Sequence, residues 1–285
     1  MTSGPFRLLA VASGLGGSEP VLLESLAARG LREGSSLLIE RLTTQEIAAV
    51  PDRIERFDPD AIFSGGSTQT VKIVGITRQI PIIAWGHVEE LIAERPRNVC
   101  GYRPPADHQR SCLVYLKRLV PHARKIAALY DDGYPPGRLA LEATSQAAPE
   151  LGLELTVYSA RDAAELERAF VQMAGAHVDA VRVMNSPFLG RSENGVVRRA
   201  LERRLPLMAY EWNTKEGALL SYVPDFARTA PLFAEMVAGI AGGAHPARFG
   251  IQVCPMSLHL NRRTADLLGI EMPADLLAEA AAIHG

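Results

Sequence analysis

The fold of this chain is decided by a segment that begins with Asp58-Pro-Asp-Ala-Ile-Phe-Ser64, continues as Gly65-Gly-Ser-Thr-Gln-Thr70 and ends with Gln79-Ile-Pro-Ile-Ile-Ala-Trp85. Short apolar runs are typical of buried strands, and polar residues with glycine are typical of the loop before a helix. The segment therefore predicts strand, loop, helix and strand, which is a β–α–β unit with parallel strands.

A second segment repeats the pattern, as Val178-Asp-Ala-Val-Arg-Val-Met184, Asn185-Ser-Pro-Phe-Leu-Gly190 and Arg204-Leu-Pro-Leu-Met-Ala-Tyr210. Elsewhere, too, apolar runs alternate with longer amphipathic stretches. Each half is therefore predicted to be a Rossmann-like α/β lobe. The 285 residues leave room for two domains, and two similar lobes suggest a ligand cleft between them.

Five strands are expected in each half. They are Leu8–Ala12, Leu37–Arg41, Ala61–Ser64, Pro81–Ala84 and Val99–Tyr102, and then Ile126–Tyr130, Leu153–Tyr158, Ala180–Met184, Leu207–Tyr210 and Ala218–Tyr222. The helices expected between them include Pro20–Arg29 after an N-cap at Ser18, Thr44–Phe57, Thr68–Thr77 and Ala227–Ala241.

Charge and composition exclude several classes of protein. The net charge of −2 gives no electrostatic reason to expect a nucleic-acid partner. The three cysteines have no CxxC spacing, so neither a disulfide framework nor a zinc site is predicted, and Cys100 and Cys254 are expected to be small core residues.

No apolar run is long enough to span a membrane. The amino terminus shows no signal-peptide pattern, which leaves both the cytosol and export with a removed leader open.

Ligands of open parallel sheets bind beyond the carboxyl ends of the strands, so the residues after each strand are the candidate site. In lobe one these are Ser13, Gly66, Ser67, Thr68, Trp85, Gly86 and His87; in the second set they are Tyr134, Asn185, Phe188, Glu211, Trp212 and Asp225.

The chemistry of these residues suits the two ends of an amino acid. Ser67, Thr68 and the N–H groups of a helix start attract a carboxylate or phosphate. Asn185, Glu211 or Asp225 could oppose an ammonium group, although each acid alone is more often a helix cap or a solvated side chain. The aromatic residues of the set could enclose an apolar side chain, or belong to the core.

Enzyme and cofactor motifs are incomplete. Gly14-Leu-Gly16-Gly17-Ser18-Glu19 has glutamate where a dinucleotide fingerprint needs its third glycine, and no Walker lysine follows either glycine loop. The histidines form no metal-binding pair, so neither a metal nor a cofactor is expected. Ser67, Asp225 and His259 occur in the order of a hydrolase triad, but the closing glycine of a nucleophile elbow is missing.

The carboxyl-terminal residues resemble those of one group of ABC transporter solute-binding proteins. The group's ending, Asn-x-x-Thr-Ala-x-x-Leu-Gly and then Pro-x-x-Leu-Leu, is matched by Asn261, Thr264, Ala265, Leu268, Gly269, Pro273, Leu276 and Leu277. Gly217-Ala-Leu-Leu-Ser-Tyr222 and Pro121-His-Ala-Arg-Lys-Ile-Ala-Ala-Leu-Tyr130 also look like segments of this family.

The resemblance implies a type I periplasmic-binding fold, with two lobes joined by three hinge strands. Lobe 1 would comprise residues 1–103 with about 224–253, and lobe 2 residues 104–223 with about 254–285. It implies capture of a small amino-acid-like or carboxylate solute by lobe closure, without chemistry, and a carboxylate site at Gly66, Ser67 and Thr68. It also implies an ABC permease as partner, a monomer, and a periplasmic or extracytoplasmic location.

Two other functions stay open at this point. One is a ligand-sensing periplasmic-binding-like domain that signals to a partner. The other is a serine hydrolase that uses Ser67.

Overall fold

The computed structural model describes residues 4–12, 19–86, 88, 92 and 96–285. The chain forms two compact units, here called unit 1 (Met1–Pro105 with Pro224–Pro255) and unit 2 (Ala106–Val223 with Met256–Gly285). The chain thus passes from one unit to the other after residues 105, 223 and 255.

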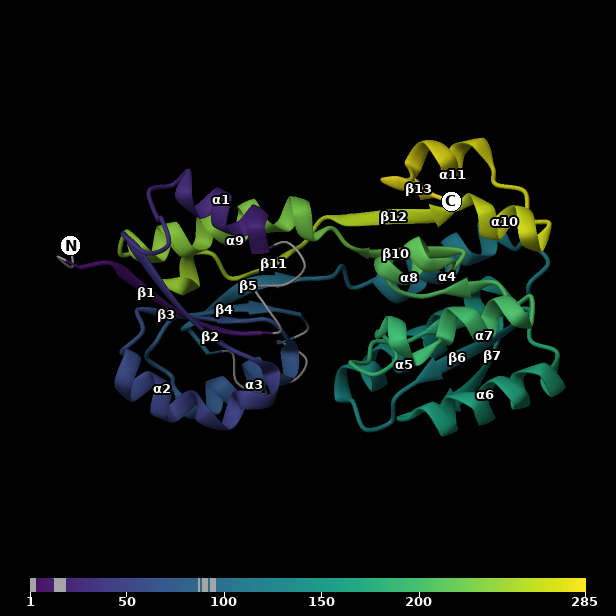
Figure 1. Ribbon diagram of the computed structural model, residues 1–285, viewed down its shortest axis with the longest axis horizontal. Helices are drawn as coiled ribbons and strands as arrows, with labels where there is room; N and C mark the ends of the chain where they lie inside the picture. The colour runs from purple at the N-terminus through teal and green to yellow at the C-terminus, as the bar shows by residue number, and fades with distance from the viewer. Residues whose placement is uncertain (1–3, 13–18, 87, 89–91, 93–95) are drawn as a thin grey trace. The chain divides into compact units, whose positions relative to one another are not determined.

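Unit 1 is a six-stranded sheet between helices (Figure 1). Its elements are β1 Phe6–Val11, α1 Glu19–Ala27, β2 Leu37–Leu42, the 3₁₀ turn η1 Thr44–Ala49, α2 Val50–Phe57, β3 Ala61–Ser64, α3 Ser67–Ile76, β4 Ile82–Trp85, β5 Val99–Arg103, α9 Phe226–Ala241, the 3₁₀ turn η4 Pro246–Arg248 and β11 Ile251–Val253. The strand order is β11-β5-β4-β3-β1-β2, and each neighbouring pair is parallel. Helices α2 and α3 cover one face and α1 and α9 the other (Figure 1).

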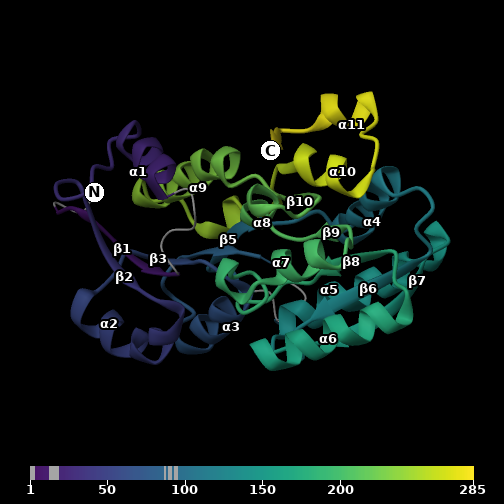
Figure 2. The ribbon, with the colours of Figure 1, turned by 45° about the vertical axis from the view of Figure 1, so that its right-hand side comes forward.

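Unit 2 has a seven-stranded sheet in the order β13-β12-β10-β9-β8-β6-β7. Its elements are α4 His108–Leu119, β6 Lys125–Tyr130, α5 Pro135–Ala147, the 3₁₀ turn η2 Pro149–Leu151, β7 Glu154–Ser159, α6 Ala163–Ala176, β8 Ala180–Val183, the 3₁₀ turn η3 Ser192–Asn194, α7 Val196–Glu202, β9 Leu207–Met208, α8 Glu211–Glu216, β10 Leu220–Pro224, β12 Met256–Asn261, α10 Arg262–Leu268, α11 Ala274–Glu279 and β13 Ala282–His284. Helices α10 and α11 lie towards the β13 edge of the sheet and α6 towards the β7 edge (Figure 2).

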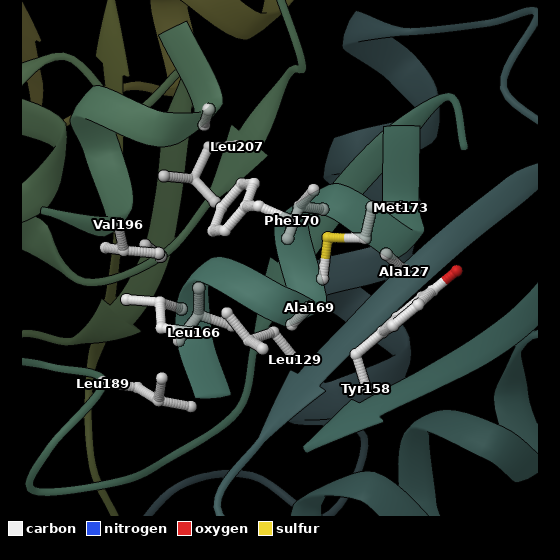
Figure 3. Packing of buried hydrophobic residues seen from close by; sticks show 14 of the residues in the cluster. Ala127, Leu129, Tyr158, Leu166, Ala169, Phe170, Met173, Leu189, Val196 and Leu207 are labelled. Carbon is white, nitrogen blue, oxygen red and sulfur yellow. The ribbon is translucent and has the colours of Figure 1, made fainter. Parts of the chain in front are cut away.

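Each face of the second sheet is covered by its own apolar core. On one face, side chains of α6 and α7 pack on β6, β7, β8 and β9, with the fully buried Phe170 at the centre of the cluster. Figure 3 shows the Phe170 ring beside Leu207, with Met173, Ala169 and Leu166 from the same helix around it. On the other face, α4, α10 and α11 contribute Leu116, Ala265 and Leu276 to a second core. Because both faces of the sheet are buried, its strands appear in the sequence as continuous apolar runs.

The expectation of five strands in each half is wrong, because the described sheets contain six and seven strands. The additional strands, β11, β12 and β13, come from the carboxyl-terminal part of the chain, which the internal repeat does not include. The ten expected strands are all present, with ends that differ by a few residues at most. The core positions of Cys100 and Cys254 are confirmed, since both are buried.

The single helix expected over Thr44–Phe57 is also wrong. The segment forms the 3₁₀ turn η1 and then α2, whose first turn contains Pro51. Proline has no N–H to donate and its ring clashes with the carbonyl four residues before it, so it is disfavoured in a helix interior and tolerated in the first turn, which is where α2 places Pro51. The N-cap expected at Ser18 lies outside the described residues.

Candidate functional site

In unit 1, the loop after β3 brings hydroxyl groups to the first turn of α3. Gly66 is the N-cap of this helix and offers no side chain to its N–H groups. Ser67 is 5% exposed, and the Thr68 hydroxyl oxygen is buried without a hydrogen-bond partner in the described part of the chain. Free N–H groups, a free hydroxyl and the positive end of the helix dipole together favour a bound anion such as a carboxylate.

The hydroxyls of Ser64 and Thr70 form hydrogen bonds within the loop itself. The Thr70 hydroxyl lies 2.7 Å from Ser64 Oγ and 2.9 Å from the Gly66 carbonyl oxygen, and both side chains are buried. This contact holds the loop in place at the end of β3. It leaves the Thr68 hydroxyl as the group with hydrogen-bonding capacity to spare.

The loop after β4 passes directly against α3. A Cβ atom on Gly86 would lie 2.4 Å from Ser67 Oγ, and Gly86 has φ +105°, a backbone conformation that other residues rarely adopt. The preceding Trp85 lies in an aromatic group, with its ring centroid 5.0 Å from that of Phe226 and 6.1 Å from that of Phe233. Unit 1 thus places an aromatic group, Trp85 with Phe226 and Phe233, one residue before the glycine that lies against the start of α3.

In unit 2, the loops after β6 and β8 are tied together by Asp131. Its carboxylate accepts hydrogen bonds from Ser186 Oγ at 2.8 Å and from the Gly133 N–H at 3.0 Å. The Tyr210 hydroxyl accepts from the Ser186 N–H at 2.7 Å, and burial raises the pKa of Tyr210, so the phenol stays neutral. Asp131 therefore organises the loops.

Asn185 directly precedes Ser186, and its side chain makes no hydrogen bond to any residue that the structure describes. Its backbone carbonyl approaches Gly137 so closely that a Cβ on Gly137 would lie 2.5 Å away. Phe188 is partly buried against the core under α6 and α7, so its ring is mainly a packing group. Tyr134 is the half-buried N-cap residue of α5.

Glu211 and Trp212 begin α8. Glu211 Oε1 lies 2.6 Å from Lys215 Nζ. Burial raises the pKa of Glu211, but Lys215, His259 and His284 lower it by more, and the net direction is downward. Trp212 stacks on Tyr210 with centroids 4.8 Å apart and donates its indole N–H to the Gly190 carbonyl, although 43% of it stays exposed. The indole is therefore a fixed, partly open aromatic surface.

The grouping of Asp225 with the loops of the second lobe is wrong, whereas the lobe bounds implied by the family resemblance, which put residues of about 224–253 in lobe 1, agree with its position. Asp225 belongs to unit 1, where it is the N-cap of α9 and accepts a hydrogen bond from the Arg228 N–H at 2.9 Å. A short strand followed by a helix looks the same in the sequence whichever domain the helix joins. The predicted site residues Ser13 and His87 lie outside the described residues.

The hydrolase arrangement finds no support in the hydrogen bonds. His259 Nε2 lies 2.9 Å from Ser257 Oγ on the same strand, and both belong to unit 2, whereas Ser67 belongs to unit 1. The described residues contain no group of three or more histidine, cysteine or acidic side chains suited to a metal ion. None of the helices in the described ranges has the length and apolarity needed to cross a membrane.

A family model described as ABC transporter substrate binding protein matches residues 17–284. This chain belongs to that family. Because the match extends over nearly the whole chain, both units of this substrate-binding protein are covered by the assignment.

Solved structures place the substrate-binding protein in the type I periplasmic-binding fold. An ABC domain from Streptococcus pneumoniae in complex with L-Trp has a TM-score of 0.85 at 19% identity, over 98% of this chain and 100% of the other. A conserved domain protein from Vibrio cholerae has a TM-score of 0.81 at 21% identity, over 98% and 99%. An ABC transporter solute binding protein from Bacillus halodurans with bound myo-inositol has a TM-score of 0.66 at 16% identity, over 94% and 98%. No curated protein matches the chain.

The sequence left two important groups unrecognised. Phe226 forms the aromatic group with Trp85, but these residues lie far apart in the chain and no local pattern links them. Arg182 is almost completely buried within β8. A basic residue inside an apolar strand run was the available signal, since arginine is seldom buried without a partner.

Proposed function

We propose that this ABC transporter substrate-binding protein captures a small carboxylate solute, of the amino-acid type, with an aromatic or apolar side chain. The observation that carries the proposal is the buried, unpartnered Thr68 hydroxyl at the start of α3, next to Ser67, which lies against Gly86. A carboxylate bound there would accept from Thr68 and from first-turn N–H groups, and the solute's side chain would meet the ring of Trp85.

The other end of the solute is assigned to Asn185. Glu211 and Asp225 have partners of their own in Lys215 and the α9 amino terminus, which makes them poorer ligands for an ammonium group. The amide of Asn185 offers both a donor and an acceptor. Trp212 and Tyr134 are assigned to the solute's side chain. The L-Trp complex of the Streptococcus pneumoniae protein supports an aromatic amino acid as the first solute to test.

Capture is proposed to occur by closure of the two units on the solute, with delivery to the membrane permease of an ABC importer. The family is typically extracytoplasmic, and the same location is proposed here. The protein is proposed to act as a monomer and to catalyse no reaction. Closure would remove water from the polar contacts, and buried polar groups left unpaired by the wrong solute would provide selectivity.

The screen that tests this proposal measures the thermal stability of the protein with L-amino acids and small carboxylates, followed by calorimetry for each solute that stabilises it. An aromatic L-amino acid or a related carboxylate is expected to raise the melting temperature, because a ligand that binds only the folded state stabilises that state. A folded protein that none of these compounds stabilises would exclude the proposed solute class.

Thr68→Val is expected to weaken binding of the solute identified in this screen by about 10- to 100-fold, which corresponds to the loss of a hydrogen bond to a charged group. Valine keeps the shape of threonine and removes only the hydroxyl. The matched control is Thr156→Val in β7, where the same change removes a half-buried hydroxyl from an edge strand of unit 2. Equal dissociation constants for Thr68→Val and the unmodified protein would rule out Thr68 as a ligand.

A further inference from the structure

Unit 2 contains a buried arginine without a carboxylate partner. Arg182 lies in β8 and is 5% exposed. Its Nη2 donates to Gln109 Oε1 at 2.6 Å, its Nε is buried without a hydrogen-bond partner in the described part of the chain, and no carboxylate within the same ranges forms a salt bridge with it. Arginine keeps its charge at every ordinary pH, and a buried charge is costly unless an opposite charge lies close to it. The described side chains therefore leave the charge of Arg182 unbalanced.

The side chains that hold the guanidinium in place are buried and polar, but neutral. Since arginine can only donate, Gln109 Oε1 accepts from Arg182, and the Gln109 amide group faces His108 Nδ1 at 3.3 Å. His108 Nδ1 therefore accepts, and His108 Nε2 donates to the Tyr222 carbonyl at 2.9 Å. An imidazole that accepts at one nitrogen and donates at the other is uncharged. Gln109 and His108 thus fix the guanidinium without balancing its charge.

Two further buried groups of this network also carry no negative charge. The Cys112 thiol donates to the Tyr222 carbonyl at 3.7 Å, and a thiol that donates keeps its proton. The Thr144 hydroxyl lies 3.4 Å from Gln109 Oε1 and donates to the Ala140 carbonyl at 2.7 Å. The network thus combines one cation with neutral donors and acceptors, an arrangement that favours a bound anion.

Arg182 lies on a strand that leads to the candidate site. It pairs with Ala128 of β6 and Met208 of β9, and the strand ends shortly before Asn185. A guanidinium presents several N–H donors in one plane, which is the geometry that a carboxylate accepts. We propose that Arg182 binds a small carboxylate in unit 2, either a free ion or a second acidic group of the solute. The second source rests on the proposed function, whereas the first does not.

This anion site differs from the carboxylate site proposed at Thr68. Thr68 belongs to unit 1 and offers a neutral hydroxyl beside helix N–H groups, whereas Arg182 belongs to unit 2 and brings a full charge. An anion at Arg182 would remove the cost of the unbalanced charge. It should therefore stabilise unit 2 and leave the stability of unit 1 unchanged, so the two sites can be tested independently.

The test follows unfolding of each unit in denaturant while acetate is added to the solute-free protein. Trp212 reports unit 2 in a Trp85→Phe background, and Trp85 reports unit 1 in a Trp212→Phe background. Acetate at ten times its dissociation constant should multiply the folding equilibrium constant of unit 2 by about 11, and the effect should saturate. Chloride, which cannot bind two donors in one plane as a carboxylate does, should have a weaker effect at equal concentration. Arg182→Met should remove the response of unit 2 to acetate.

The controls separate this site from general salt effects and from Thr68. Arg124→Met removes an exposed arginine just before β6 of the same unit, and it should keep the acetate response of unit 2. Thr68→Val should also keep that response, so a failure at Thr68 and a failure at Arg182 can be told apart. If Arg182→Met does not fold, Arg182→Lys takes its place. Lysine keeps the charge but not the planar donors, so it should weaken acetate binding by about tenfold.

Two results would overturn the proposal. One is a folded unit 2 whose stability does not respond to acetate, because the charge of Arg182 would then be balanced within the chain. The other is an equal acetate response in the unmodified protein and in the folded Arg182 variant.

The solute found in the thermal screen distinguishes the two sources of the carboxylate. If its affinity falls at least tenfold in Arg182→Met and is unchanged in Arg124→Met, the site binds a second acidic group of the solute. If both variants keep the affinity for the solute while only Arg182→Met loses the acetate response, the site binds a free carboxylate ion.

Discussion

Replacing Gly101 by alanine is expected to reduce the free energy of unfolding of unit 1 by more than about 4 kcal/mol, or to prevent unit 1 from folding. Gly101 is in β5 with φ +151°, and a Cβ atom there would lie 1.9 Å from the Ala84 carbonyl oxygen and 2.8 Å from two other backbone atoms of Ala84. Backbone atoms in the middle of a sheet cannot move aside as a flexible side chain can. Strands β4 and β5 would have to separate where Ala84 pairs with Gly101.

The same substitution is expected to abolish solute binding, because Ala84 directly precedes Trp85 and Gly86 at the end of β4. The matched control is Gly75→Ala, in the exposed last turn of α3 of the same unit, where an added Cβ would meet nothing within 4 Å. Alanine in a helix is favoured over glycine, so this control should gain up to about 1 kcal/mol.

The measurement can be made separately for each unit, because the chain has two tryptophans, Trp85 in unit 1 and Trp212 in unit 2. A Trp212→Phe background leaves the fluorescence of Trp85 to report unfolding of unit 1 in denaturant. A free energy of unfolding of unit 1 in Gly101→Ala that lies within about 1 kcal/mol of the parent value would contradict the backbone clash.

Phe170→Ala is expected to reduce the free energy of unfolding of unit 2 by about 3–5 kcal/mol. The Phe170 ring is fully buried between α6 and the sheet, beside Leu207 (Figure 3). Its removal takes away a large apolar contact area and leaves a cavity that the surrounding strands cannot fill, since their spacing is set by backbone hydrogen bonds. Arg203, whose guanidinium lies 5.6 Å from the ring centroid, would lose its partner as well.

The control for this change is the neighbouring residue on the same helix. Val171 is 59% exposed, so Val171→Ala should alter the free energy of unfolding by no more than about 0.5 kcal/mol. Unfolding is followed through Trp212 in a Trp85→Phe background. A loss below about 1 kcal/mol for Phe170→Ala would mean that the α6 core is loosely packed.

The two substitutions differ in their relation to the proposed site. Gly101→Ala should disturb unit 1 and the Trp85 loop together, because the clash is with Ala84, which directly precedes Trp85. Phe170→Ala acts on the face of the second sheet that α6 and α7 cover, and it leaves the first turn of α3 unchanged. Folded Phe170→Ala should therefore still bind the solute. Its binding should be lost only at the denaturant concentrations at which Trp212 reports that unit 2 unfolds.

Much of the architecture could be read from local patterns. Apolar runs of strand length, separated by amphipathic stretches, predicted two α/β halves because a strand buried on both faces must be apolar throughout. The carboxyl-terminal motif from Asn261 onward identified the family. In the structure Asn261 caps α10, accepting from the Thr264 N–H at 2.8 Å, and Thr264 Oγ1 donates to the Gly217 carbonyl at 2.9 Å. These motif residues carry local hydrogen bonds, which explains why they appear as a sequence signal.

The candidate site could be predicted from the sequence less completely than the architecture, because the state of its polar groups depends on tertiary contacts. The sequence placed Ser67, Thr68, Trp85 and Gly86 at strand ends, since parallel strands end at the same edge of a sheet, but it could not tell which hydroxyl would be free. Thr70 and Ser64 have the same chemistry and differ only in that the fold brings them to within hydrogen-bond distance of each other.

What the sequence by itself determined is the fold class, the two halves and the set of loops that could bind a solute, because hydrophobic periodicity and turn chemistry are local properties of the chain. What only the tertiary structure decided is which of those polar groups are already satisfied. Asp131 accepts from Ser186, Asp225 caps α9, and Arg182 donates to Gln109, each through a partner distant in sequence or hidden in an ordinary helix pattern. A hydrogen bond or an ion pair depends on distances of a few ångströms, and those distances exist only once the chain has folded.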